Sequence, residues 1–172
     1  MMNYFKITIL MVLVCVTTFS ANAKKFKWEL GKPVEIFTTG QGRNGTQMVM
    51  AWAVARNADK AIDQAKIDAV TAALFYGIPH DKSTHGMGVS NLGPMLSQED
   101  YDLNKTLIGN FFKKGEFLNY VMEINSSYPS GENNIKVDGG RRIGISLLVD
   151  YPGLHQWIRN NNIKQGLGDH FK

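Results

Sequence analysis

Residues 57–78 read NADKAIDQAKIDAVTAALFYGI, and every local signal in this stretch favours one helix. Asn57 can cap the helix with its side-chain oxygen, and Asp59 lies where the positive end of the helix dipole favours an acid. Alanine dominates the interior and has the highest helix propensity of all residues. Gly77 offers a left-handed stop, and Pro79 prevents continuation. The sequence therefore predicts one long helix around which the rest of the chain is arranged.

The apolar side chains of this helix form one narrow face made mainly of methyl groups. At about 100° per residue, that face holds Ile62, Ala65, Ala69, Ala72, Ala73 and Tyr76, with Gln64, Asp68 and Thr71 roughly opposite. Such a surface lets the helix axis lie close to a flat partner, and the flanking segments offer a sheet. We expect core packing; the alternative is a docking face for another protein.

Residues 1–23 read MMNYFKITILMVLVCVTTFSANA, which is the layout of a secretory signal peptide. A single lysine is followed by an apolar core from Ile7 to about Phe19 and by a small-residue cleavage pattern that ends at Ala23. The core is short for a membrane span, and no later segment approaches the roughly 18 apolar residues that a span needs. We expect cleavage after Ala23, export, and no integral membrane span in the mature protein.

The expected mature chain, residues 24–172, contains no cysteine, because Cys15 lies in the signal segment. Val14 stands before Cys15 where a lipobox has Gly, Ala or Ser, so no lipid anchor is expected. Disulfides and thiol catalysis are therefore excluded from the mature chain. Its 18 Lys and Arg against 15 Asp and Glu give a net charge of +3, which is too mild to indicate a nucleic-acid partner. This composition fits the periplasm or outer envelope of a bacterium.

Two strand patterns precede the helix. Val34–Thr39 and Thr46–Arg56 are expected to form a hairpin around the glycine-rich turn at residues 40–45. A phosphate-binding loop is not expected there, because such a loop leads into a helix and here a strand follows. Alternation along the second strand puts Met48, Met50, Trp52 and Val54 on one face and Val49, Ala51, Ala53 and Ala55 on the other. The small residues of the second set can meet the alanine-rich helix.

The remaining elements complete the expected fold. Ser97 and the acids after it predict a second helix that ends near Gly115 and buries Tyr101, Leu107, Ile108, Phe111 and Phe112. Glu116–Ser126 and Arg141–Val149 alternate like strands. Residues 135–140 can start the latter strand early, with a bulge or a bend at Gly139-Gly140. Pro152 suits the first turn of a last helix.

The order of these elements is strand, strand, helix, helix, strand, strand, helix. We expect a single α+β domain over residues 24–172, with an approximately four-stranded, mainly antiparallel sheet and the helices packed on one of its faces.

Two segments offer candidate binding residues. Residues 79–94 read PHDKSTHGMGVSNLGP, where His80, Asp81 and His85 have the chemistry of metal ligands, although their spacing matches no metal motif. The whole loop, residues 79–96, is long for a compact domain, and a loop of that length is a candidate binding segment. Arg141 and Arg142 could contact an anion; the alternative is strand-edge charge that discourages association between sheets.

The alanine-rich helix AIDQAKIDAVTAALF at residues 61–75 and the strand-to-helix passage VDYPGLHQWI at residues 149–158 carry a family resemblance. Together with the glycine-containing first hairpin, they resemble a family of bacterial envelope domains: small outer-membrane lipoproteins and the amino-terminal domain of flagellar assembly proteins. The resemblance spans most of residues 34–160. It implies an envelope-associated binding or assembly module without catalysis, and it carries over no functional residues.

We therefore expect a noncatalytic exported envelope protein that binds another protein or a surface polymer, with no cofactor. No serine–histidine–acid, cysteine or strong metal motif favours an enzyme. Two alternatives stay open. One is a small secreted metal-dependent hydrolase that uses His80, Asp81 and His85. The other is a subunit of a homomeric envelope assembly.

Overall fold

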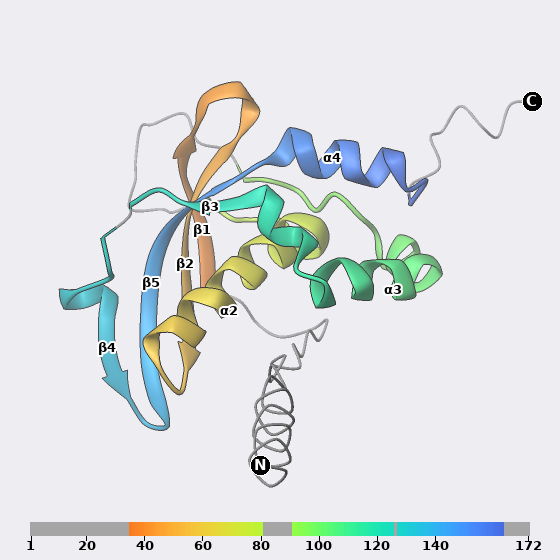
Figure 1. Ribbon diagram of the computed structural model, residues 1–172. Coiled ribbons are helices and arrows are strands. Elements are labelled where there is room, and N and C mark those ends of the chain that lie inside the picture. Colours follow the sequence, from red (N-terminus) through yellow and green to blue (C-terminus); the bar gives the residue numbers. More distant parts are fainter. Residues whose placement is uncertain (1–34, 81–90, 126, 164–172) are drawn as a thin grey trace, which may run out of the picture.

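The computed structural model describes residues 35–80, 91–125 and 127–163, and these form an α+β fold (Figure 1). The strands are β1 Glu35–Gln41, β2 Gln47–Ala55, β3 Val121–Glu123, β4 Asn134–Val137 and β5 Gly140–Val149. The helices are α2 Ala58–Thr71, α3 Gln98–Lys113 and α4 Tyr151–Asn160. The predicted α+β class is confirmed. The predicted signal segment lies outside the described residues.

All strands pair antiparallel, in the order β1-β2-β5-β3, and β4 pairs with β5 on the same side as β3. Among the described residues the sheet therefore has five strands, one more than the approximately four that were predicted. Residues 134–140 do not start β5 early around a bulge. They form a separate strand and a tight turn, in which Gly139 has a φ of 80°. The Asp138-Gly139 pair is a typical hairpin signal.

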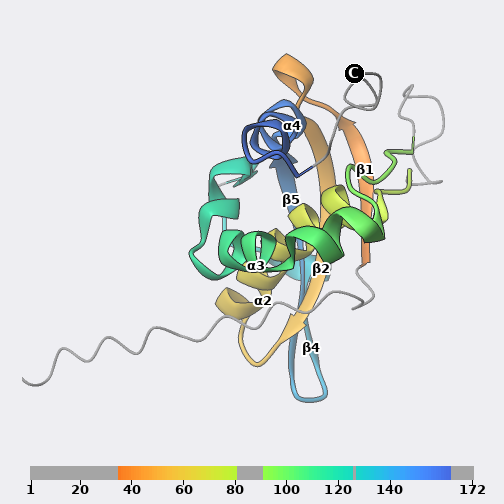
Figure 2. The ribbon, with the colours of Figure 1, turned by 90° about the vertical axis from the view of Figure 1, so that its right-hand side faces the viewer.

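The helices cover one face of the sheet, as predicted. Figures 1 and 2 show α2 next to the strands, with α3 on the far side of α2. Val49, Ala51 and Ala53 of β2 face α2 and are almost fully buried. Small residues on both surfaces allow this close approach. Ala61, Ala65 and Ala69 of α2, and Ala72 directly after it, have no exposed surface.

The ends of α2 follow the predicted chemistry. The Asn57 side chain accepts a hydrogen bond from the Lys60 N–H at 3.0 Å. Gly77 has a φ of 74°, and a Cβ atom there would collide with the Leu92 carbonyl oxygen. Glycine is therefore required at this stop.

The last turn of α2 departs from the predicted helix, because residues Ala72–Tyr76 form a π-turn. The carbonyls of Ala73 and Leu74 accept hydrogen bonds from Met95 and Leu96, at 3.2 and 2.8 Å. A π-turn contains an extra residue and so rotates the side chains that follow it. Tyr76 is accordingly 43% exposed rather than buried. Thr71, a predicted polar position that precedes this turn, is also buried.

Helix α3 begins with the predicted cap, a reciprocal pair in which Ser97 and Asp100 each bond to the other's backbone N–H. Its predicted apolar stripe is buried at Tyr101, Ile108, Phe111 and Phe112, and Leu107 is partly buried. The Phe111 ring stacks on Trp157 of α4 with 4.1 Å between centroids. Pro152 lies in the first turn of α4, as predicted.

The predicted strand Glu116–Ser126 was wrong over its first half. Residues Glu116–Tyr120 form a 3-10 turn, and only Val121–Glu123 pair with β5. The buried residues are Phe117 and Val121, four apart, whereas a half-buried strand buries every second residue. Phe117 packs on Phe112 of α3 at 5.5 Å between centroids. This tertiary contact prevails over the alternating pattern.

Candidate functional site

The face of the sheet opposite the helices carries a row of large apolar side chains. On β2, Met48, Met50 and Trp52 are half-buried and Val54 is 55% exposed. Their neighbours in register on the same face are Glu35 and Phe37 of β1, Arg142, Gly144, Ser146 and Leu148 of β5, and Met122 of β3. We name this set the open sheet face, because none of the described helices packs on it.

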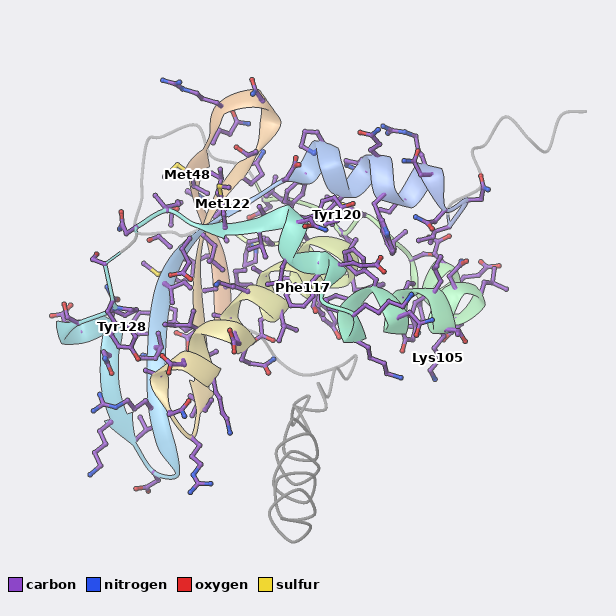
Figure 3. The ribbon with its side chains drawn as sticks, in the orientation of Figure 1. Met48, Lys105, Phe117, Tyr120, Met122 and Tyr128 are labelled. Carbon is purple, nitrogen blue, oxygen red and sulfur yellow. The ribbon has the colours of Figure 1, made fainter. Side chains whose placement is uncertain are left out.

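Methionines gather at one end of the open sheet face. Met48 and Met122 flank Leu148 in the register of β2, β5 and β3, and Figure 3 shows both at this end of the sheet. Met122 is 61% exposed. Methionine is flexible and polarizable, so a surface rich in it can adapt to a partner.

Arg142 of β5 stacks on Trp52 of β2 on this face. The Arg142 guanidinium lies over the Trp52 ring, 4.1 Å from its centroid, and forms a salt bridge with Glu35 of β1. Beneath the ring, Gly144 of β5 leaves the space that Trp52 occupies. The charge of Arg142 is therefore compensated inside the protein, which weakens the prediction that it contacts an external anion.

Arg141 and Arg142 do not act as edge charge, so this alternative was wrong. At these residues β5 pairs with β2 on one side and with β4 on the other, and is a central strand. The exposed Arg141 donates to the Asn134 side-chain oxygen of β4 at 2.6 Å.

His80 lies next to β1, and the other two predicted ligands, Asp81 and His85, lie outside the described residues. The His80 N–H donates to the Asn91 side-chain oxygen at 2.7 Å, and Thr38 forms a β-bridge to His80. Within the described ranges, no three His, Cys, Asp or Glu side chains are grouped to hold a metal ion. The proposed metal loop therefore stays a prediction.

Two hollows border the open sheet face. The first, a trough of about 150 Å³, lies between the β3–β4 connection and β5, where Gly144 and Ser146 help to line it. The second, a groove of about 320 Å³, lies at the end of β2 and is lined by Glu35, Trp52, Ala53, Val54, Gln64, Asp68 and Arg142.

The outer wall of the trough is held by the hydrogen bonds of its own residues. The Tyr128 hydroxyl donates to Asp59 of α2 at 3.1 Å, and the Asn134 side chain donates to the Pro129 carbonyl at 2.9 Å. Desolvation and the contact with Asp59 raise the pKa of the Tyr128 phenol. Tyr128 therefore remains a neutral donor at physiological pH.

The sequence did not predict this trough, because residues 127–133 match no motif and were assigned to no element. The Asp138-Gly139 turn is the available signal, since it predicts that the preceding residues pair with β5. That pairing brings the connection beside Ser146.

No protein-family model matches this chain, and no curated protein or solved structure matches it either. The fold and surface define its class: an α+β protein whose antiparallel sheet has helices on one face and exposed apolar side chains on the other. None of the described helices is long and apolar enough to cross a membrane.

Proposed function

We propose that this chain is a noncatalytic, exported envelope protein that binds another protein through its open sheet face. The observation that carries the proposal is the contrast between the two faces of the sheet. One face is closed by α2, while the other exposes Met122 and Val54 at 61% and 55%. On β2, the half-buried Met48, Met50 and Trp52 lie on the same face, and apolar side chains gathered on one face are typical of sites that bind protein.

The charge of the open sheet face supports a protein partner rather than a charged polymer. Its charged side chains, Glu35 and Arg142, form a salt bridge with each other. The remaining members are apolar or small. Desolvation of such a surface costs little, and burial of methionine and tryptophan supplies most of the binding free energy.

Site-specific photo-crosslinking in the producing cell tests this proposal. A photoreactive residue at Met122 or at Val54 is expected to capture a protein partner. The matched control is Asp63, which is exposed on α2, away from this face. Equal capture from Asp63, or no capture from either position on the face, would contradict the proposal. A product of twice the chain's mass would identify the partner as a second copy, as a homomeric assembly requires.

Export is the second part of the proposal and is supported by the sequence of residues 1–23. Mass spectrometry of the protein from cell envelopes is expected to give a chain that begins at Lys24. A chain that keeps Met1 and fractionates with the cytoplasm would refute this part.

A further inference from the structure

The trough between the β3–β4 connection and β5 has a chemistry that differs from the open sheet face beside it. Its lining is mostly polar, and most of its polar side chains are neutral amides or hydroxyls: Asn125, Ser127, Tyr128, Ser130, Asn133 and Ser146. Each can donate or accept hydrogen bonds without carrying charge. The trough therefore suits a ligand that offers several uncharged polar groups.

The single carboxylate of the trough lining is already paired. Glu123 of β3 forms a salt bridge with Lys66 of α2, with 2.7 Å between Oε1 and Nζ. A ligand with a charge of either sign would find no uncompensated opposite charge in the lining. Desolvation of a charged ligand would then be unfavourable.

An aromatic side chain stands at this polar site. Tyr128 is 58% exposed, and Figure 3 places it near the start of β4. Its ring offers an apolar surface next to the amides and hydroxyls. A sugar ring carries hydroxyl groups around its rim and apolar C–H groups on its faces. Its hydroxyl groups can bond to the amides and hydroxyls of the trough, and its apolar face can pack on the tyrosine ring.

The size of the trough limits how much of a ligand can enter. A cavity of about 150 Å³ holds one molecule of the size of benzene. A sugar ring with its hydroxyl groups is larger than benzene, so the trough can enclose part of one ring, with the rest of the ligand outside it.

Hydrogen bonds among its own residues hold the wall of the trough together. Besides the contacts of Tyr128 and Asn134 described above, the Asn133 N–H donates to the Ser130 carbonyl at 3.2 Å. A wall that is already ordered loses less conformational entropy on binding.

From these observations we propose that the trough binds one ring of an uncharged saccharide, such as a unit of a surface glycan. This site adjoins the open sheet face and shares Met50, Gly144 and Ser146 with it, but its ligand is a saccharide and not a protein. Either proposal can fail while the other stands.

Calorimetric titration of the purified protein tests the saccharide site. The probes are maltose, cellobiose and diacetylchitobiose as neutral sugars, glucuronic acid and glucosamine as charged ones, and the tripeptide Gly-Ser-Gly. We expect saturable binding of at least one neutral disaccharide and no binding of the charged sugars. No binding of the three neutral sugars at about 10 mM, or equal binding of a charged sugar or the tripeptide, would overturn the proposal.

Three variants locate the binding. Tyr128→Ala is expected to weaken binding about tenfold, and Ser146→Leu to abolish it by filling the trough. The control Tyr76→Ala removes another exposed aromatic ring, roughly 25 Å along α2 from Asp59 by helix geometry, and is expected to bind like the parent. If Ser146→Leu does not fold by circular dichroism, Asn133→Ala replaces it. Unchanged affinity in both trough variants would contradict the assigned site.

Discussion

The ring of Trp52 lies against the backbone of Gly144 on the neighbouring strand, so closely that a Cβ atom at residue 144 would be 2.8 Å from three ring atoms. Trp52 is the largest side chain on the open sheet face. It can lie across the neighbouring strand only because Gly144 has no side chain. Trp52 in turn supports Arg142, whose guanidinium lies over the ring.

Gly144→Ala is expected to lower the free energy of unfolding by about 1–3 kcal/mol, because the added methyl group displaces the indole ring. Urea unfolding measures the change. Gly109→Ala is the matched control: nothing lies within 4 Å of a Cβ atom at that position in α3. The control should raise stability by up to about 1 kcal/mol, because alanine has the higher helix propensity. A stable Gly144→Ala with an unchanged Trp52 environment would contradict the described packing.

Ala69→Leu tests the close contact between α2 and the sheet. Ala69 has no exposed surface, so a larger side chain must push the helix away, at a cost of about 1–3 kcal/mol in unfolding free energy. Asp63→Leu introduces the same side chain on the exposed side of α2 and should change stability by less than about 0.5 kcal/mol. Thermal and urea unfolding of both variants give the comparison. Similar losses in the two would argue against a methyl-lined interface.

Tyr151→Phe tests a buried polar group in α4. The Tyr151 hydroxyl is buried and has no hydrogen-bond partner among the described residues. Its removal is expected to leave the free energy of unfolding at neutral pH unchanged or to raise it by about 1 kcal/mol, because an unsatisfied buried hydroxyl is unfavourable. A loss above about 1 kcal/mol in urea unfolding would indicate a hydrogen bond that the hydroxyl makes in solution.

The same tyrosine predicts how stability depends on alkaline pH. Burial raises the pKa of Tyr151 in the folded state above 10.0, its usual value, which the unfolded chain retains. Above about pH 10 the unfolded chain loses a proton that the folded chain keeps, so the free energy of unfolding falls as the pH rises. Urea unfolding between pH 8 and about 11 should show this decline, with a smaller slope in Tyr151→Phe. Equal slopes would show that Tyr151 does not contribute.

The sequence predicted those parts of the fold where local preference and tertiary packing agree. The alanine-rich helix, its cap Asn57 and its stop Gly77 are all present, because propensity, capping and burial favour the same structure there. The alternation along β2 also identified the face that meets α2. Local patterns failed at Phe117, which packs on Phe112 near the end of α3, and at Tyr76, where Met95 and Leu96 bond to the π-turn.

The candidate site was harder to predict, because its parts are distant in the sequence. Arg142 pairs with Glu35 across 107 positions, and the trough joins residues 123–133 to residues 144–146. No local pattern encodes such pairings. The strand β4 could have been predicted from the sequence, because the Asp138-Gly139 turn indicates a hairpin. A prediction of that hairpin would have given the correct number of strands.

The central claim is that the open sheet face binds a protein partner, and methyl NMR of methionine tests it most directly. Met48, Met50 and Met122 lie on this face, whereas Met95 is a buried control in the core. On addition of the partner captured by crosslinking, we predict shifted or broadened signals from the first three methionines and an unchanged environment for Met95. Signals from the three face methionines that stay in place while the partner binds would contradict the account.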